Sequence, residues 1–453
     1  MELFQKRTGR FLKVSAIILA MLFALSACAT STAPATATAA ATDAPAAAAT
    51  DTATTDKGEP TEITYFSSKS ATDETVVSLQ IVADMFNEQG GNIKFTVESA
   101  ADRPSYDQKL RTMLTGGQVP DMYDLDPTPF TQELADAGLL LDMQAFLEEI
   151  GELDGYVPLS INYCRMPDGS LYTIPLEFTT EMIWYNTDMF AACGLEKPKT
   201  FDDMLNASKV LAENGYTPIT IDGMDGWPLL RHLAMVPYRL AGNDFLNGLA
   251  SGETHMSDNI GMQALQFMTD IGQYYQQGFT STDYATAMSL FMSGKAAMYG
   301  IGTWELNNFI DANRPADLHI DYFYMPTMDG AVTQPNEYWA FGGIGLTANP
   351  EKFDGPLKDF FTFIVKNYSS VYLARQHFAP QKVAVPEGVE FDPLFLKIKD
   401  DIDSIGSSAC RPWDVVLSAD VISTINDNLP GLCMGEITPE EFAKIVDDAL
   451  ANN

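Results

Sequence analysis

The alternation of strands and helices after residue 60 constrains the fold of this chain more than any other feature. Residues 63–66 and 93–97 are short runs rich in β-branched and aromatic residues, and 122–125 is a third such run. Apolar residues at helical spacing separate these runs, first at 76–86 and then around 106–114. Strands that alternate with helices in this way predict an α/β fold, with a largely parallel sheet and helices on both of its faces.

Polar residues follow the first and third of these strands. Ser67 and Ser68 come after the first strand, and Asp124 and Asp126 end the third. Ligands of such sheets gather beyond the carboxyl ends of the strands, so we expect Ser68, Asp124 and Asp126 to contact a ligand. The alternative is that the two aspartates cap the helix that starts near Pro129, where an acidic side chain is favourable.

Residues 182–185 form the strand that opens a second region, and Trp184 within it is expected in the core. Two later helices have clear start signals, because Thr200 with Asp203 and Thr438 with Glu441 have the spacing of a capping box. These features specify the fold and carry no chemistry.

The first 28 residues have the three parts of an export signal. Basic residues precede the apolar run 14–25, and Leu25-Ser26-Ala27-Cys28 closes it. The run is too short to span a bilayer comfortably. Its end resembles the lipobox of bacterial lipoproteins, which implies a signal peptide over 1–27 and lipidation of the Cys28 thiol at the mature N-terminus. The alternative is an ordinary signal peptide with an incidental cysteine.

The stretch that follows Cys28 is almost entirely Ala, Thr, Ser, Pro and Asp. We expect a lipidated, disordered tether over 28–60, which lets a folded body reach away from the membrane surface. Roughly 390 residues remain beyond it, a size that suggests two globular lobes. No later segment is long and apolar enough to cross a membrane.

The chain is strongly acidic, with a formal net charge of -34. Removal of residues 1–27 takes away more basic than acidic side chains, so the mature chain is more acidic still. Phosphate backbones and anionic membrane surfaces are bound by clusters of Lys and Arg. We therefore exclude nucleic acid as a partner and interpret the charge as solubility at the cell exterior.

The cysteines and histidines do not match any metal motif, because their spacing is scattered. We expect no metal and no cofactor. The cysteines beyond the lipobox either stay unpaired as small buried residues or form disulfides, with Cys410 and Cys433 as the preferred couple. The residues in question are Cys164, Cys193, Cys410 and Cys433, with His232, His255, His319 and His377.

Several blocks of sequence are similar, in order and spacing, to the family of extracellular solute-binding proteins that includes maltose-binding protein. Each block is weak alone, but together they span nearly the whole mature chain. The matching blocks are 120–124 (PDMYD), 134–139 (LADAGL), 172–175 (YTIP), 184–190 (WYNTDMF), 194–201 (GLEKPKTF), 291–298 (FMSGKAAM), 302–304 (GTW), 342–343 (GG) and 435–442 (GEITPEEF).

This resemblance implies two α/β lobes with a central ligand cleft, joined by hinge segments that the chain crosses more than once. Lobe one would hold residues 61–176 and 314–372, and lobe two residues 177–313 and 373–453. The function implied is that of a monomeric substrate-binding lipoprotein of an ABC importer. It would capture a mono- or oligosaccharide at the outer face of the cytoplasmic membrane and deliver it to the permease subunits. Ligand would favour the closed state by touching both lobes.

A sugar has apolar C–H faces and a rim of hydroxyls, so its site needs flat aromatic rings with rigid donors and acceptors. Trp304 follows the FMSGKAAM block, where the family places a stacking aromatic, and Trp227 lies in a polar turn. Glu177 is expected at the crossing between lobes, either as an acceptor for sugar hydroxyls or as a solvated hinge residue. The remaining cleft candidates are Tyr338, Trp339, Arg411 and Trp413.

Other functions leave weaker marks on the sequence. Hydrolase motifs such as G-x-S-x-G and H-E-x-x-H are absent, so we expect no enzyme, although carboxylate pairs of a glycosidase form in space and leave no motif. The same scaffold also serves for a non-sugar polar solute, or for a protein that presents its ligand to a membrane sensor. Sequence alone separates these functions poorly, because only the docking face would differ.

Overall fold

A computed structural model of the chain describes residues 58–452, apart from 101–102, 311 and 406–407. The predicted signal peptide, the lipidation site at Cys28 and nearly all of the predicted tether lie outside the described residues. The described residues belong to one compact unit, Lys57–Asn453. This unit contains two five-stranded β-sheets.

The first sheet has the strand order β2-β1-β3-β10-β4. β1 runs parallel to β2 and β3, whereas β10 is antiparallel to β3 and β4. β10 comes from a distant part of the chain and lies between two N-terminal strands. The strands are β1 (Thr61–Ser67), β2 (Ile93–Ser99), β3 (Met122–Asp124), β4 (Ile174–Pro175) and β10 (Gly345–Ala348).

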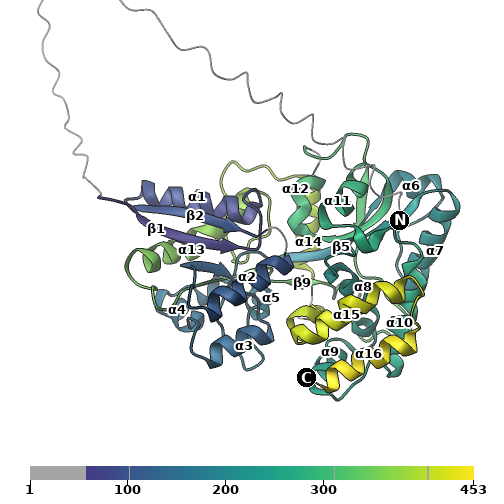
Figure 1. Cartoon of the computed structure of the whole chain (residues 1–453). Coiled ribbons are helices and arrows are strands. Elements are labelled where there is room, and N and C mark those ends of the chain that lie inside the picture. The colour runs from purple at the N-terminus through teal and green to yellow at the C-terminus, as the bar shows by residue number, and fades with distance from the viewer. Residues whose placement is uncertain (1–57, 101–102, 311, 406–407, 453) are drawn as a thin grey trace, which may run out of the picture. The chain divides into compact units, whose positions relative to one another are not determined.

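The helices of this half confirm the strand–helix alternation that the sequence predicts. α1 buries Val76, Leu79 and Val82 and packs against α13, and Figure 1 shows these two helices beside β1 and β2. The helices are α1 (Glu74–Glu88), α2 (Arg103–Thr115), α3 (Pro129–Asp136), α4 (Met143–Ile150), η1 (Leu153–Gly155), α5 (Pro158–Tyr163) and α13 (Gly355–Ala374).

The second sheet has the order β6-β7-β5-β8, and β9 also pairs with β5. All eight residues of β5 are buried, as expected for a central strand. Trp184 in β5 is fully buried and donates to the carbonyl of Ile301 at 3.1 Å, which confirms its place in the core. The strands are β5 (Thr179–Asn186), β6 (Thr217–Thr220), β7 (Ala296–Gly302), β8 (Ile320–Phe323) and β9 (Ala340–Phe341).

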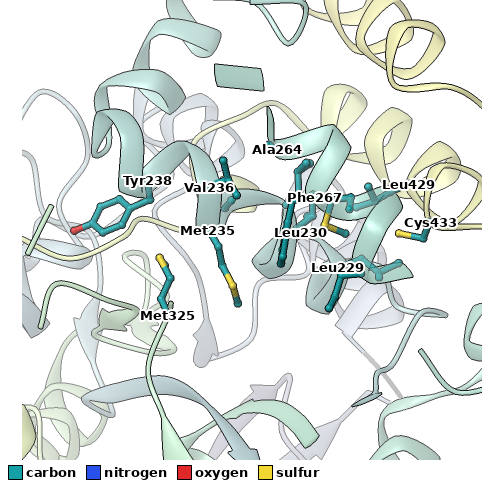
Figure 2. Packing of buried hydrophobic residues seen from close by; sticks show 14 of the residues in the cluster. Leu229, Leu230, Met235, Val236, Tyr238, Ala264, Phe267, Met325, Leu429 and Cys433 are labelled. Carbon is teal, nitrogen blue, oxygen red and sulfur yellow. The ribbon is translucent and has the colours of Figure 1, made fainter. Parts of the chain in front are cut away.

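α8 forms the centre of the helical layer around the second sheet. Figure 2 shows its residues Leu229, Leu230 and Val236, which belong to one hydrophobic cluster with Phe267 of α10 and Leu429 of α15. Both predicted capping boxes are confirmed, at the starts of α7 and α16. The helices are α6 (Thr187–Ala192), α7 (Phe201–Glu213), α8 (Trp227–Ala241), α9 (Asp244–Ser251), α10 (Asn259–Gly272), η2 (Phe279–Ser281), α11 (Tyr284–Met292), η3 (Thr303–Glu305), α12 (Leu306–Phe309), α14 (Pro393–Asp403), η4 (Trp413–Val415), α15 (Ala419–Cys433) and α16 (Pro439–Ala451).

The chain passes between the two sheets at 176–178, at 342–344 and again after α13. The three crossings are hydrogen-bonded to one another: Leu176 donates to the carbonyl of Ile344 at 3.0 Å, and Phe178 to that of Phe378 at 3.0 Å. The predicted start of the second piece of lobe one at residue 314 differs from the strand pairing, because β8 joins the second sheet. The chain returns to the first sheet only at β10.

The cysteines of the described residues, Cys164, Cys193, Cys410 and Cys433, are all free. The preferred couple of Cys410 and Cys433 is therefore wrong for this structure, and the alternative of unpaired residues holds. Three of the four are buried, as small apolar side chains in a core often are. Among the described helices, none combines the length and the apolar character that crossing a bilayer requires.

Candidate ligand-binding site

The carboxyl ends of β1 and β3 meet at one edge of the first sheet, where Asp124 organises the loop after β1. Its carboxylate accepts hydrogen bonds from the Ser68 backbone N–H at 2.7 Å, the Ser68 hydroxyl at 2.9 Å and the Ser67 hydroxyl at 3.2 Å. Tyr65 donates to the other oxygen. Asp124 is 2% exposed, so its oxygens are occupied by protein donors and the geometry supports a positioning role for it.

Burial raises the pKa of Asp124 to about 6, because the hydrogen bonds from Tyr65 and Ser68 offset only part of the desolvation of its charged form. None of its hydrogen-bond partners is a cation. Ser68, which Asp124 holds in place, is half-buried at the same edge.

Asp126 lies just beyond β3 and forms an ion pair with Arg103 of α2. The capping alternative for Asp124 and Asp126 is wrong, because Thr128 occupies the N-cap of α3 and no side chain caps that helix. The backbone carbonyl of Asp126 instead accepts from the N–H of Thr128 at 2.8 Å. Pro129 in the first turn has no backbone N–H, so one group fewer needs a capping side chain.

Glu177 lies in the first crossing and contacts the second crossing, helix α13 and the loop after β1. It is 2% exposed, receives the Tyr372 hydroxyl at 3.2 Å and the Ile344 N–H at 3.4 Å, and pairs with Lys69 at 3.3 Å. The solvated-hinge alternative does not fit this burial. Gly343 of the second crossing passes so close that a Cβ there would lie 2.1 Å from Cγ of Glu177.

Lys69 connects this junction to the second sheet. Burial alone would lower the pKa of its amine, but the carboxylates of Glu177 and Asp73 outweigh burial and hold that pKa above its ordinary value. The ammonium group lies 5.9 Å from the ring centroid of Trp304, within the range of a cation–π interaction. A charged group from the first half therefore faces an aromatic ring of the second.

Trp304 stands directly after β7 and is half-buried. Its ring lies across Gly302, where a Cβ would be only 2.1 Å from the indole, so the Gly-Thr-Trp spacing has a steric reason. Its Nε1 donates to the Tyr284 hydroxyl at 2.8 Å, and its ring is 6.1 Å from that of Trp227 and 6.4 Å from that of Phe341. Trp227 was expected in a polar turn, but it is the first residue of α8 and is also half-buried.

Arg231, one turn after Trp227 on α8, is held from two sides. Its guanidinium pairs with Glu181 of β5 at 3.0 Å and with Asp414 at 2.9 Å. The same group lies 5.4 Å from the ring centroid of Trp227 and 5.2 Å from that of Trp339. Burial raises the pKa of Glu181 even though Arg231 opposes that shift.

Tyr163, the last residue of α5, is an aromatic residue of the first half that reaches this region. Its ring centroid is 5.3 Å from that of Phe341. Burial raises the pKa of its phenol well above the ordinary value, Asp126 and Asp414 raise it further, and Arg231 opposes them. Burial lowers the pKa of Arg411, and nearby Tyr163 offsets part of that shift.

Three of the predicted cleft aromatics are buried. Tyr338, Trp339 and Trp413 are 1%, 2% and 2% exposed and belong to the core around the second sheet. Tyr338 stacks on Tyr324 at 3.7 Å, and Trp413 packs against Phe245, so neither has a face free for a ligand. Trp339 contacts the site through Arg231, and its carbonyl accepts the Glu181 N–H at 3.2 Å.

The structure therefore brings Trp304 and Trp227 together and connects Glu177 to them through Lys69. Asp126 instead pairs with Arg103, and Arg411 lies three residues before Asp414, a partner of Arg231. Sequence reasoning missed Lys69, Arg231, Tyr163 and Tyr284. Two of these had a signal: Lys69 follows the Ser67-Ser68 loop at the sheet edge, and Arg231 is four residues after Trp227, the spacing that places two side chains on one face of a helix. Tyr163 and Tyr284 had none, because their position depends on which elements meet in space.

The arrangement supplies half-buried indole rings beside fixed donors and acceptors, the chemistry that recognises a molecule with both apolar faces and polar edges. Within the described ranges, no group of three or more His, Cys, Asp or Glu side chains could hold a metal ion.

A family profile for bacterial extracellular solute-binding proteins matches residues 70–367. Because this match covers more than half of the chain, the protein belongs to that family. The family consists of binding proteins, so the expected class is confirmed, and so is the expected two-lobed α/β fold.

Individual relatives are distant. A multiple sugar-binding protein from Streptococcus mutans is 26% identical over 267 residues, which cover 56% of this chain and 60% of that protein. A structure from a study of xylan utilisation by Caldanaerobius polysaccharolyticus has a TM-score of 0.76 at 22% identity, covering 85% of this chain and 99% of that one. A chitin oligosaccharide binding protein has a TM-score of 0.74 at 23% identity, covering 87% and 100%. These structures show the shared fold.

Proposed function

We propose that this protein is the substrate-binding lipoprotein of an ABC importer, which captures a mono- or oligosaccharide outside the cell and delivers it to the membrane permease. It acts without catalysis and without a cofactor. Cys28 carries the lipid that anchors it at the outer face of the cytoplasmic membrane, and the protein works as a monomer. Family membership and the sugar-binding names of its relatives support the transport role.

The observation that carries the carbohydrate proposal is the pair of half-buried indoles, Trp227 and Trp304, held 6.1 Å apart among charged groups. A sugar ring places its C–H face on an indole and offers its hydroxyls to side chains around it. Trp304 is fixed for this task by its hydrogen bond to Tyr284 and by the close approach of Gly302. A fixed ring loses little conformational entropy on binding.

Residues from both halves of the molecule converge on these rings. Lys69 follows β1 in the first sheet and lies over Trp304, and Tyr163 of α5 contacts Phe341 of β9. A solute held here would touch both halves and favour the state in which they are close. In this proposal Ser68 and Asp126 face the solute from the first half, and Asp124 positions Ser68. Glu177 pairs with Lys69 and fixes its position, and the ring of Trp339 in the second half packs against the Arg231 guanidinium.

The proposal is tested by titrating neutral sugars into the purified protein by calorimetry, followed by the same titration of Trp304→Ala. Loss of the stacking surface should weaken binding of any sugar that binds the wild type by about tenfold or more, as expected for about 1.4 kcal/mol or more. Phe363→Ala, which removes a half-buried ring of α13 near Phe86, is the matched control and should bind as the wild type does.

Equal affinity of the wild type and Trp304→Ala for the sugar would remove the stacking role. Hydrolysis of an oligosaccharide during the titration would contradict a purely binding function.

A further inference from the structure

The cations that surround the candidate site are, with one exception, already neutralised by carboxylates. Lys69 pairs with Glu177 at 3.3 Å and with Asp73 at 3.9 Å. Arg231 has Glu181 and Asp414 as partners. Arg103 likewise pairs with Asp107 and Asp126. Each of these three cations therefore has two acidic partners.

Arg411 is the exception. Among the described residues its guanidinium has no hydrogen-bond or ion-pair partner, although burial lowers its pKa and the nearby Tyr163 offsets only part of that effect. Its backbone is held firmly: the Arg411 N–H donates to Asn243 at 2.9 Å, and the preceding Cys410 donates to the carbonyl of Tyr338 at 3.1 Å. A half-buried guanidinium on a fixed loop has five donors to offer.

The surroundings of Arg411 are not cationic as a whole. Cys410, the residue before Arg411, forms a β-bridge with Trp339, whose ring centroid lies 5.2 Å from the Arg231 guanidinium. Asp414, three residues after Arg411, pairs with the same guanidinium at 2.9 Å. Six carboxylates pair with Lys69, Arg103 and Arg231, so carboxylates outnumber the four cations of this region, Arg411 included. A carboxylate or phosphate on the ligand would lie near these acids, and, among the described residues of this region, Arg411 would be the one cation without an acidic partner that could pair with it. Burying such an anion has a high desolvation cost. A hydroxyl or ring oxygen accepts a guanidinium hydrogen bond without that cost.

We propose that the site selects an uncharged saccharide over a sugar acid or a sugar phosphate, and that Arg411 is a specificity-determining residue that donates to its hydroxyl or ring oxygens. This inference rests on the proposed carbohydrate function. The excess of carboxylates repels an anionic ligand, and Arg411 supplies directional hydrogen bonds from the second half.

The test is calorimetry with two sets of probes on the whole mature chain. The neutral set is raffinose, xylotriose and triacetylchitotriose, and the anionic set is trigalacturonate and glycerol 3-phosphate. A neutral probe should bind at least tenfold more tightly than either anion. Arg411→Gln should weaken that binding about tenfold or more, the usual scale for a charged hydrogen bond in a half-buried site. Arg411→Lys should recover part of it, since the charge remains but the planar fork is lost.

Arg165→Gln is the matched control, because Arg165 donates to Gln144 and Gly169 on the first half and contacts none of the site residues named here. It should bind the neutral probe as the wild type does. A second variant, Asp414→Asn, removes one acid beside Arg231. It should raise the affinity for trigalacturonate several-fold relative to the neutral probe.

The outcomes separate this inference from the function it rests on. Tightest binding of trigalacturonate or glycerol 3-phosphate would overturn the selection of uncharged ligands. If the tightest ligand is trigalacturonate, the carbohydrate proposal itself still holds. Unchanged affinity in a well-folded Arg411→Gln would overturn the role of Arg411. Absence of binding to every saccharide in both sets would refute the carbohydrate function and this inference with it.

Discussion

At the scale of single residues, two aspartates at either end of β3 show how partners decide the state of a buried acid. Burial alone would raise the pKa of Asp121, but Lys352 at 2.7 Å and two hydrogen bonds from Thr64 outweigh it and lower that pKa. Asp124 receives only neutral donors, so burial prevails and its pKa rises to about 6. Three positions apart, the same side chain has opposite shifts.

The raised pKa of Asp124 predicts a pH-dependent stability. Between its ordinary value of 3.8 and about 6 the folded chain holds a proton that the unfolded chain has lost, so the contribution of Asp124 to stability falls as pH rises through that window. The loss is about 3 kcal/mol for a shift of this size. Asp124→Asn should abolish this part of the pH profile in denaturant unfolding curves measured from pH 4 to pH 7.

Asp329→Asn, at an exposed position, is the control for the substitution itself. An unchanged slope in Asp124→Asn would show that another group causes the pH dependence.

At the scale of elements, the crossing segments depend on a close backbone approach. Gly343 has a φ of +62°, which side-chain-bearing residues rarely adopt, and it passes against Glu177. Glu177 in turn holds Lys69 toward Trp304. The backbone position of Gly343 therefore affects the aromatic site, because it fixes the Glu177 carboxylate, which in turn fixes the Lys69 amine beside Trp304.

Gly343→Ala should destabilise the fold by about 2 kcal/mol or more, because it adds backbone strain and a clash with Glu177. Sugar binding should weaken as well, since displaced Glu177 no longer fixes Lys69. Thermal unfolding and calorimetry measure the two effects. Gly388→Ala is the matched control: its φ of +81° is equally unfavourable, but no atom lies within 4 Å of the added Cβ. Equal destabilisation by both changes would contradict the clash.

At the scale of the whole molecule, the described fold is one compact unit. The proposed anchor at Cys28 precedes it in the sequence. If Cys28 carries the lipid, a folded sugar-binding body remains at the cell surface only through this residue.

Cys28→Ala should move the protein from the membrane fraction to the soluble fraction of the expressing bacterium, without changing its sugar affinity. Immunoblots of the two fractions measure the first effect, and calorimetry the second. Cys193→Ala, at a half-buried cysteine that ends α6, is the control and should stay with the membrane. Membrane retention of the Cys28 variant would contradict lipid anchoring at this residue.

Much of the fold follows from local patterns in the sequence. The apolar spacing of α1, the capping boxes of α7 and α16 and the core position of Trp184 are short-range properties, and the structure has all of them. The insertion of β10 between β3 and β4 is not local, because it pairs residues more than two hundred positions apart. The pairing of β8 with β5 in the second sheet is likewise non-local.

For the candidate site, the sequence by itself determined the residue types and the close approach of Trp304 to Gly302, because residues two positions apart create it. Only the tertiary structure decided which of the other aromatics face the site. Tyr338 and Trp413 are candidates in the sequence just as Trp227 is, yet packing against Tyr324 and Phe245 buries them. Likewise, Lys69, Arg103 and Arg231 each pair with at least one carboxylate from another element, and those pairs form only when the chain has folded.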